Sequence, residues 1–183
     1  ERLMIAIFGL VARLKFLPPK VRGLAVQKLS AARNSSAAQQ LLKLFGTHDP
    51  DIRDEVKKAI KSLGVVLVEP AMRQLSQPAP PAQRAAAEAL ALVGPVAAPA
   101  LPVLTQQLGS SILDLRAAAL TTIGAVGSGA AGCVEQVTKH LSSDHIKESS
   151  AAAKALGKIG PAAKSAVPQL IALVGHRDKA VRE

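Results

Sequence analysis

The sequence predicts an all-α fold, a right-handed α-solenoid of stacked antiparallel helix pairs with a period of about 33 residues. Two segments of the chain are closely alike: AAAEALALVGPVAAPALPVL from Ala85 and AAAKALGKIGPAAKSAVPQL from Ala151. The glycines that close the first half of successive units, Gly94, Gly127 and Gly160, are 33 residues apart. A fixed period of this size is typical of stacked supersecondary units. The apolar residues follow helical spacing, so each unit is expected to be a pair of helices.

The composition favours close packing of small side chains over one large core. The 183 residues include three Phe and neither Trp nor Tyr, although 49% of the chain is hydrophobic. An array of repeats needs only small contacts, because each unit buries its face against its neighbours.

One unit can be followed along the chain from Asp49. Asp49 is expected to cap a helix that begins at Pro50, because proline is tolerated in the first helical turn. Apolar residues then recur at helical spacing until Gly64, and glycine commonly follows the end of a helix. A second helix closes near Leu75, which completes an antiparallel pair.

The same signals organise residues 1–183 as a single array, which we expect to be a fragment of a longer protein. They predict a leading helix at 3–16, helix pairs at about 19–45, 50–75, 80–108, 111–141 and 144–174, and a truncated repeat at 178–183. Arg33 with Asn34 replaces the closing glycine of the first pair, and Ser111 with Asp114 resembles a capping box in the fourth. The connection that follows Gly64 is three residues shorter than its counterparts.

The motifs DPDIR from Asp49 and DKAVR from Asp178, together with the segment from Ala151, resemble HEAT repeats of the short bacterial type. This type is often labelled HEAT-like or phycobilisome-lyase-like, and the resemblance covers residues 19–183. It implies an armadillo-like scaffold for protein–protein interaction, with an accessory role in a lyase-type enzyme as a distant third function. One repeat position usually holds arginine, so we expect an incomplete arginine ladder here. That position is filled by Arg22, Arg53, Gln83, Arg116, Ser149 and Arg182.

The chain offers little for catalysis or for a metal. Cys133 is the only cysteine, which excludes an internal disulfide and a thiolate-only metal site, and we expect its thiol to be buried. No His-Glu dipeptide occurs among the four histidines, and no nucleophilic triad, phosphate loop or carboxylate dyad can be recognised. We therefore expect no enzyme activity, no cofactor and no metal. Arg13 and Lys15 interrupt the first apolar stretch, so we see no secretory signal and expect a cytoplasmic protein.

The net charge of +10 is concentrated near the start of the chain. Residues 1–48 contain eight Lys or Arg and one Glu, which gives +7. The candidate basic patch consists of Arg13, Lys15, Lys20, Arg22 and Lys28. Such a patch attracts nucleic acid, anionic lipid or an acidic protein, or is only a solvated face. Without Trp or Tyr to stack on bases, nucleic acid would be bound through its phosphates.

Residues 3–16 allow two interpretations. Leu3, Ile7, Leu10 and Leu14 form a helical apolar stripe beside the basic residues. The stripe favours a terminal helix that packs in the array and is covered by a preceding unit. A helix lying on a membrane surface is the alternative, and contact of residues 3–22 with a membrane is the less favoured of the two.

Long polar side chains recur in register along the second helices, which usually line the concave side of such arrays. The candidate partner-binding residues are Arg73, Gln74, Gln106, Gln107, Gln136, Lys139, His140 and Gln169. They suit recognition of a partner's backbone, although they are equally the exposed positions of ordinary helices. The sequence thus favours a non-catalytic protein-binding scaffold. A basic solenoid that binds nucleic acid through phosphates is the alternative, and the oligomeric state and the partner's identity stay open.

Overall fold

The computed structural model describes residues 2–175, and within them every regular element is a helix. This confirms the predicted all-α class. The chain divides into two compact units, of which the structure describes residues 2–93 and 94–175. The predicted truncated repeat at 178–183, with Arg182 in the arginine position, lies outside the described residues. The prediction that all repeats form a single array stays a prediction.

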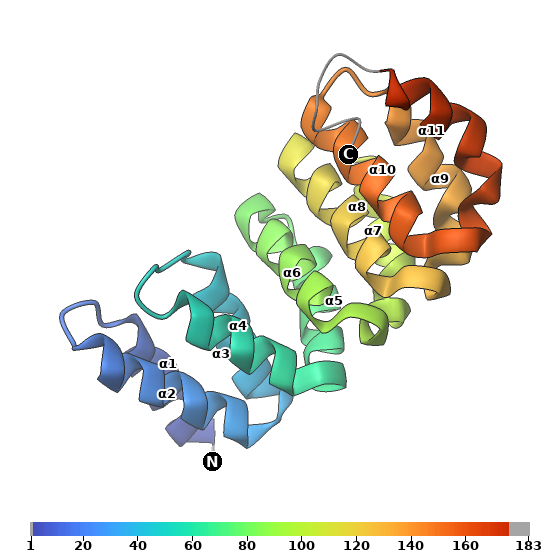
Figure 1. Ribbon diagram of the computed structural model, residues 1–183. Helices are drawn as coiled ribbons and strands as arrows, with labels where there is room; N and C mark the ends of the chain where they lie inside the picture. The colour runs from blue at the N-terminus through green and yellow to red at the C-terminus, as the bar shows by residue number, and fades with distance from the viewer. Residues whose placement is uncertain (1, 176–183) are drawn as a thin grey trace. The chain divides into compact units, whose positions relative to one another are not determined.

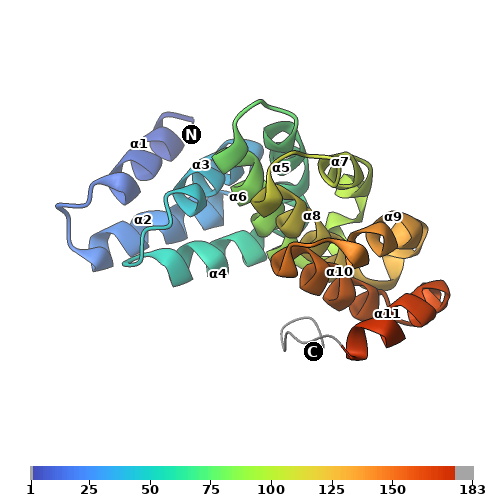
Figure 2. The same ribbon diagram turned by 90° about the horizontal axis from the view of Figure 1, so that it is seen from above.

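Unit 1 consists of two layers of helices. Its helices are α1 (Arg2–Arg13), α2 (Pro19–Ala32), α3 (Ser35–Gly46), α4 (Arg53–Leu63), α5 (Val68–Leu75) and α6 (Pro80–Val93). The first helices of the pairs, α2, α4 and α6, pack side by side, and α1, α3 and α5 form the other row (Figures 1 and 2). The predicted leading helix is α1, which packs against α2 and α3 as a second helix would.

Unit 2 repeats this plan with longer connections. Its helices are α7 (Leu101–Gln107), α8 (Leu113–Val126), α9 (Val134–Lys139), α10 (Ile146–Ile159) and α11 (Val167–Val174). The first helices α8 and α10 pack along each other, and α9 packs against α10. A 3₁₀ segment precedes each second helix: Gly94–Ala100, Gly127–Cys133 and Gly160–Ala166.

The second helices are shorter than the sequence suggests, because a 3₁₀ segment takes the place of their first turns. This segment has seven residues in unit 2, but the equivalent segment Gly64–Leu67 in unit 1 has four. The three residues missing after Gly64 are therefore missing from the 3₁₀ segment, and α5 keeps its full length.

The glycines that end the first helices have a conformational role. Gly127 and Gly160 have φ values of 73° and 76° with ψ near −140°, a region that is open to glycine alone. Arg33, which replaces the closing glycine of the first pair, also adopts positive φ, at 43°. Its ψ of 42° lies in the left-handed helical region, so the first pair closes with a positive φ but with a different backbone conformation from that of Gly127 and Gly160.

Two predicted helix caps are wrong. α4 begins at Arg53, and the carboxylate of Asp49 instead accepts a hydrogen bond from the amide of Asp51 at 3.1 Å. α8 begins at Leu113 without a side-chain cap, and it is Ser110 Oγ that accepts from the amide of Ile112, also at 3.1 Å. Both side chains stabilise the turn before the helix, because the chain enters each helix through an extra turn.

Two stretches, Pro80–Gln107 and Leu113–Ser142, are long and apolar enough to cross a membrane by length and composition alone. Each of them is interrupted by a 3₁₀ segment that starts at a glycine with positive φ, Gly94 or Gly127. They are therefore successive helices of the repeat, and most of the apolar window in Leu113–Ser142 is buried.

In unit 2, α8 and α10 approach each other closely at Gly124. A β-carbon added at Gly124 would lie 2.7 Å from the α-carbon of Ala155. The backbones of the two helices can approach this far only because Gly124 has no side chain.

Replacing Gly124 with alanine is expected to lower the stability of unit 2 by about 1–3 kcal/mol, the usual cost of an extra methyl group in a well-packed core. Gly157→Ala in α10 is the matched control, because a β-carbon there meets nothing within 4 Å. It should stabilise the protein by about 0.5–1 kcal/mol, since alanine is the better helix former. Urea unfolding measures both changes, and equal effects of the two variants would contradict the close packing.

Candidate functional site: the surface of the second helices and the junctions between pairs

In unit 1, Arg22 joins three segments from within the core. Its side chain is fully buried on α2, and its Nε donates to the carbonyl oxygen of Ala12 at 3.1 Å. The guanidinium also pairs with Asp49 and, at 3.3 Å, with Asp51 in the turn before α4. Burial raises the pKa of the Asp49 carboxyl, but hydrogen bonds from Arg22 and the amide of Asp51 outweigh it, so this pKa is lowered.

This burial corrects the candidate basic patch. Arg22 cannot contact an external ligand, because its cationic group is enclosed and bonded to two carboxylates. Lys15, Lys20 and Lys28 are exposed, as is Arg13, which donates to Gln40 Oε1 at 2.6 Å.

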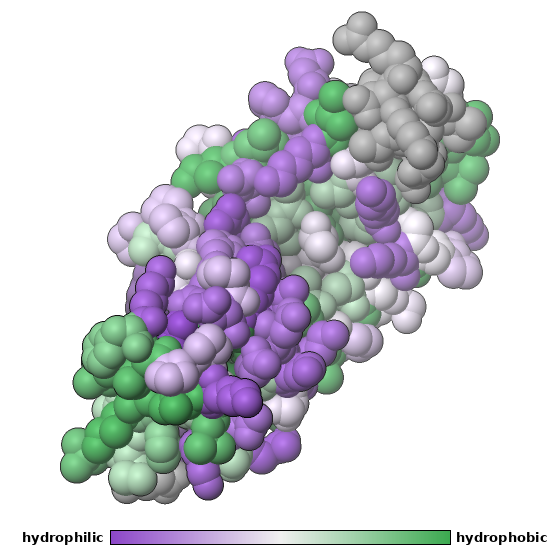
Figure 3. All heavy atoms as spheres, turned by 60° about the vertical axis from the view of Figure 1, so that its left-hand side comes forward, coloured by the Kyte–Doolittle hydropathy of each residue, from purple (hydrophilic) through white to green (hydrophobic). Residues whose placement is uncertain are grey.

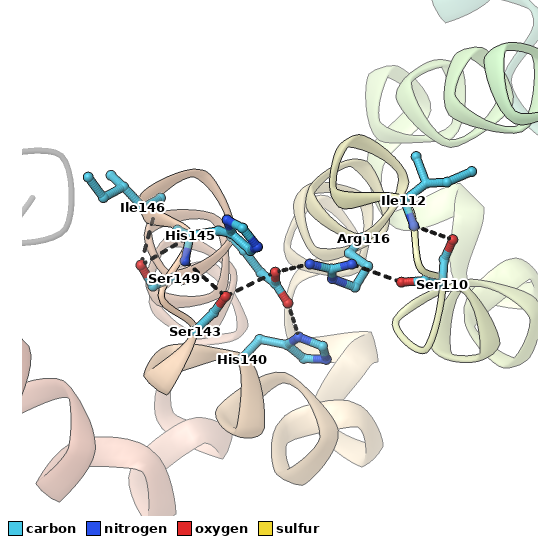
Figure 4. Close-up of polar contacts among 9 residues, drawn as sticks. Ser110, Ile112, Arg116, His140, Ser143, His145, Ile146 and Ser149 are labelled. Carbon is cyan, nitrogen blue, oxygen red and sulfur yellow. Dashed lines mark hydrogen bonds and ion pairs between the residues drawn. The ribbon is translucent and has the colours of Figure 1, made fainter.

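Arg116 on α8 forms the corresponding junction in unit 2 (Figure 4). Its Nη1 donates to the carbonyl oxygen of Ser110 at 2.9 Å, and its Nη2 pairs with Glu148 Oε2 at 2.6 Å. Glu148, in the first turn of α10, is buried. It also accepts from Ser143 Oγ at 3.0 Å and contacts Nδ1 of His140 at 2.5 Å. The carboxylate thus has partners from α8, from α10's preceding turn and from the end of the α9 segment.

These contacts keep Glu148 ionised. The hydrogen bond from Arg116 is the main cause that lowers the pKa of Glu148 to about 2, with His140 and Ser143 adding to it against the opposing effect of burial. The same hydrogen bond raises the pKa of Arg116. The buried pair is therefore charged at neutral pH.

The arginine position of the repeat has one recurring structural role. Arg22, Gln83 and Arg116 each donate a hydrogen bond to a backbone carbonyl near the end of the preceding pair. For Gln83 the acceptor is Leu75, at 2.9 Å. Arg53 is exposed, and Ser149 Oγ lies 3.4 Å from two carbonyl oxygens of its own helix start. Arginine therefore joins neighbouring pairs at only some of the repeat positions, as expected from the sequence. At one position the neutral amide of Gln83 makes the equivalent hydrogen bond.

One column of the candidate partner-binding residues lies at these junctions. Gln74 Nε2 donates to the carbonyl oxygen of Ala82 in α6 at 2.8 Å, and His140 contacts Glu148 of α10. Gln74, Gln107 and His140 are all half-buried. Regular spacing gave them equivalent positions in their repeats, but it could not show that the next helix covers part of the surface of Gln74 and of His140.

The neighbouring column is exposed. Arg73 pairs with Glu69 at 2.6 Å and donates to Ser35 Oγ at 3.2 Å, and Lys139 pairs with Glu135 at 3.2 Å. Gln106 is exposed as well. Exposed ion pairs of this kind contribute little stability, so a partner can displace them at small cost.

In unit 2 a shallow groove of about 390 Å³ is bordered by polar residues of the α9 segment and of the segment that leads into α11. Four of its residues lie on one face of the α9 segment at helical spacing, and two come from the next second-helix segment. The lining residues are Glu135, Thr138, Lys139, Ser142, Ser165 and Gln169. Gln136, beside them in sequence, is half-buried, and its Oε1 atom is buried without a hydrogen-bond partner among the described residues.

Within residues 2–175, no group of three or more His, Cys, Asp or Glu side chains is placed to hold a metal ion. Cys133 is buried, and its sulfur lies 3.7 Å from Thr105 Oγ1. The candidate functional features of the described residues are therefore polar surfaces and ion pairs between helix pairs.

Neither a protein-family model nor a curated protein sequence matches the chain. Solved structures do match it. An engineered protein superposes with a TM-score of 0.61 at 20% identity, covering 97% of this chain and 92% of its own. The karyopherin Kap121p bound to the SUMO protease Ulp1p superposes with a TM-score of 0.75 at 14% identity over 98% of this chain. The chain has a HEAT-like helical-repeat fold.

The HEAT-like chain corresponds to a limited part of its larger neighbours. It covers 24% of Kap121p, both in the Ulp1p complex and in a complex with Nup53p, where the TM-score is 0.74 at 13% identity. At these identities the similarity establishes the HEAT-like fold.

Proposed function

We propose that the chain is a non-catalytic protein-binding scaffold that holds an extended segment of a partner protein on the second-helix surface of unit 2. The observation that carries this proposal is the polar groove between the α9 segment and the segment that leads into α11. Its residues come from two successive repeats, so a partner segment can run along the row of second helices and contact both.

The lining of the groove suits a polypeptide. Lys139 and Gln169 supply hydrogen-bond donors, Glu135 and Gln169 supply acceptors, and Thr138 and Ser142 add hydroxyl groups. A peptide backbone offers the complementary groups at every residue. The exposed Gln106 on α7 extends the polar row within the same unit.

The structural neighbours support a protein partner. Kap121p, which has the same kind of fold, has been crystallised in complex with Ulp1p and with Nup53p. Proteins are thus bound by a protein with a similar helical-repeat fold, and the proposal extends that class of ligand to this chain.

A peptide-display selection on the full chain, followed by fluorescence anisotropy with the selected peptides, tests the proposal. The triple variant Gln106→Ala, Lys139→Ala and Gln169→Ala should bind them at least about tenfold more weakly, a loss of about 1.4 kcal/mol. The matched control is Thr121→Ala, Lys154→Ala and Lys158→Ala, three exposed positions on the first helices of unit 2. The control variant loses two lysines and the groove variant only one. A general effect of charge would therefore weaken peptide binding more in the control variant. Equal affinity of the groove variant and the wild type would contradict the proposal.

Binding of nucleic acid through phosphates is the second candidate, favoured by the exposed Lys15, Lys20 and Lys28. A salt titration with random double-stranded DNA separates the two, because phosphate contacts lose affinity steeply as salt rises. If the chain binds nucleic acid through phosphates, the wild type should bind DNA strongly. The combined variant Lys15→Ala, Lys20→Ala and Lys28→Ala should then lose this binding. The groove variant should leave any DNA binding unchanged.

A further inference from the structure

An open groove of about 390 Å³ runs between α2 and α4, the first helices of two successive pairs in unit 1. Its walls come from one face of each helix. The wall residues of this α2–α4 groove are Gln27, Ser30 and Ala31 on α2 and Glu55, Lys58, Ala59 and Ser62 on α4. Because the groove lies on the side of α2 that faces α4, described helices form both of its walls.

The repeat position of Ser30 holds a glycine in unit 2, where the first helices pack more closely. Ser30 and Gly124 each lie eight residues after the arginine position, Arg22 in α2 and Arg116 in α8. At Gly124 the backbones of α8 and α10 come together, and these helices pack more tightly than α2 and α4 do. Ser30 instead places a hydroxyl between its two helices, with Oγ 2.6 Å from Ser62 Oγ. The groove is therefore a feature of the α2–α4 sequences rather than of the repeat in general.

The two serine hydroxyls offer acceptors to a ligand. Ser62 Oγ donates to the carbonyl oxygen of Ala59 at 2.8 Å. A hydroxyl has a single proton, so Ser30 is the donor in the contact between the serines, and both protons are used. The half-buried carboxylate of Glu55 adds a further acceptor that has no partner among the residues the structure describes. A polypeptide backbone supplies the N–H donors that these acceptors need, whereas a phosphate backbone supplies only acceptors.

The charge of the groove and its rim is positive. Figure 3 shows a broad hydrophilic area on unit 1, beside the apolar end formed by α1 and α2. Lys58 is exposed in the groove wall, and Lys28 and Lys61, each next in sequence to a wall residue, are exposed as well. Within residues 2–175 these three lysines form no ion pair, and Glu55 is the one acidic residue of the walls. An occupant that carries Asp or Glu side chains gains from this excess of positive charge.

We propose that the α2–α4 groove binds an extended acidic segment of a partner protein. The backbone amides of the segment donate to Glu55 and to the serine hydroxyls, and its carboxylates pair with Lys28, Lys58 and Lys61. The groove lies on the first helices of unit 1, so it is a second binding surface, separate from the polar groove on the second-helix surface of unit 2.

A display library of dodecapeptides with Asp or Glu at alternate positions, selected on the full chain, tests the proposal. The selected peptides, labelled with fluorescein, should bind the full chain with Kd below about 100 µM. The variant Gln27→Ala with Lys58→Glu should bind them at least about tenfold more weakly. Gln27 and Lys58 are exposed, and each lies five residues after the arginine position of its repeat, so the variant should unfold in urea as the wild type does. A mirrored library with Lys at the alternate positions should yield no peptide that binds the groove.

The matched control is Thr121→Ala with Lys154→Glu in unit 2. Thr121 and Lys154 have the same repeat position on α8 and α10, they are exposed, and the change in charge is the same. The control should therefore bind the selected peptides as the wild type does. Equal binding by the two variants, or a selection that yields no peptide below the stated Kd, would overturn the proposal. An oligothymidylate of the same length that bound more tightly than the peptides, and lost its affinity with Lys58→Glu, would identify nucleic acid as the occupant and overturn it as well.

Discussion

Replacing Arg22 with methionine is expected to lower the free energy of unfolding of unit 1 by about 3–5 kcal/mol, the usual cost of breaking a buried ion pair. Methionine fills much of the space but leaves the buried Asp49 carboxylate and the Ala12 carbonyl without their donor. The free energy falls because an unpaired buried charge loses its hydration without compensation.

Hydrogen exchange followed by mass spectrometry locates this effect in the full chain. Amides of α2 and α4 should lose protection, because Arg22 joins these two helices to the end of α1. Arg53→Met is the matched control: Arg53 has the same repeat position but is exposed, so its replacement should change stability by less than about 0.5 kcal/mol. Adding Asp49→Asn to Arg22→Met should recover part of the loss, because it removes the unpaired charge and keeps an acceptor for the Asp51 amide. An Arg22 variant as stable as the Arg53 variant would contradict this role of the buried pair.

The second large effect is a loss of stability in acid that depends on Glu148. The folded protein holds the pKa of this carboxyl at about 2, against 4.5 for the ordinary value. A lowered folded pKa stabilises the folded state above the unfolded pKa, and the contribution disappears as pH falls through the folded pKa. The stabilisation from Glu148 should therefore be complete above about pH 5.5 and decline between about 4.5 and about 2. The difference between the folded and the ordinary pKa of Glu148 corresponds to about 3 kcal/mol of unfolding free energy.

Urea unfolding of the wild type and Glu148→Gln across this pH range measures the contribution. The difference in unfolding free energy between them should be largest near neutral pH and shrink steadily toward pH 2. Glu135→Gln provides the control, because Glu135 is an exposed glutamate whose ion pair with Lys139 lies in solvent. A pH-independent difference for Glu148→Gln would mean that Arg116 and His140 do not stabilise the ionised carboxyl.

The repeat made most of the fold predictable from the sequence. Helical spacing, the glycines at intervals of 33 and the shorter connection after Gly64 all correspond to elements of the structure. The 3₁₀ segments were missed, because small apolar residues after a glycine are compatible with either helical geometry. The short bacterial subtype of the HEAT-like fold stays a prediction.

The candidate site was less predictable, because register along a helix gives direction but not exposure. Spacing gave Gln74 and His140 equivalent positions in their repeats, yet their partners Ala82 and Glu148 belong to the next helix. Arg22 was grouped with Lys15 and Lys20 by sequence proximity, although in the structure it is buried and pairs with Asp49, 27 residues later. Contacts of this kind depend on how successive pairs stack. Neither the number of charges nor the spacing of residues in the sequence predicts that stacking.

The junctions between pairs also determine how the protein should respond to mechanical tension. Arg22 pairs with Asp49, 27 residues away, Arg116 with Glu148, 32 residues away, and Asp114 with Lys147, 33 residues away. Each of these contacts connects only neighbouring pairs, as in other quasi-one-dimensional repeat proteins. Within a unit pulled from its ends, helix pairs should peel off one after another. The force trace should show several small extensions in succession, each releasing about one repeat of chain.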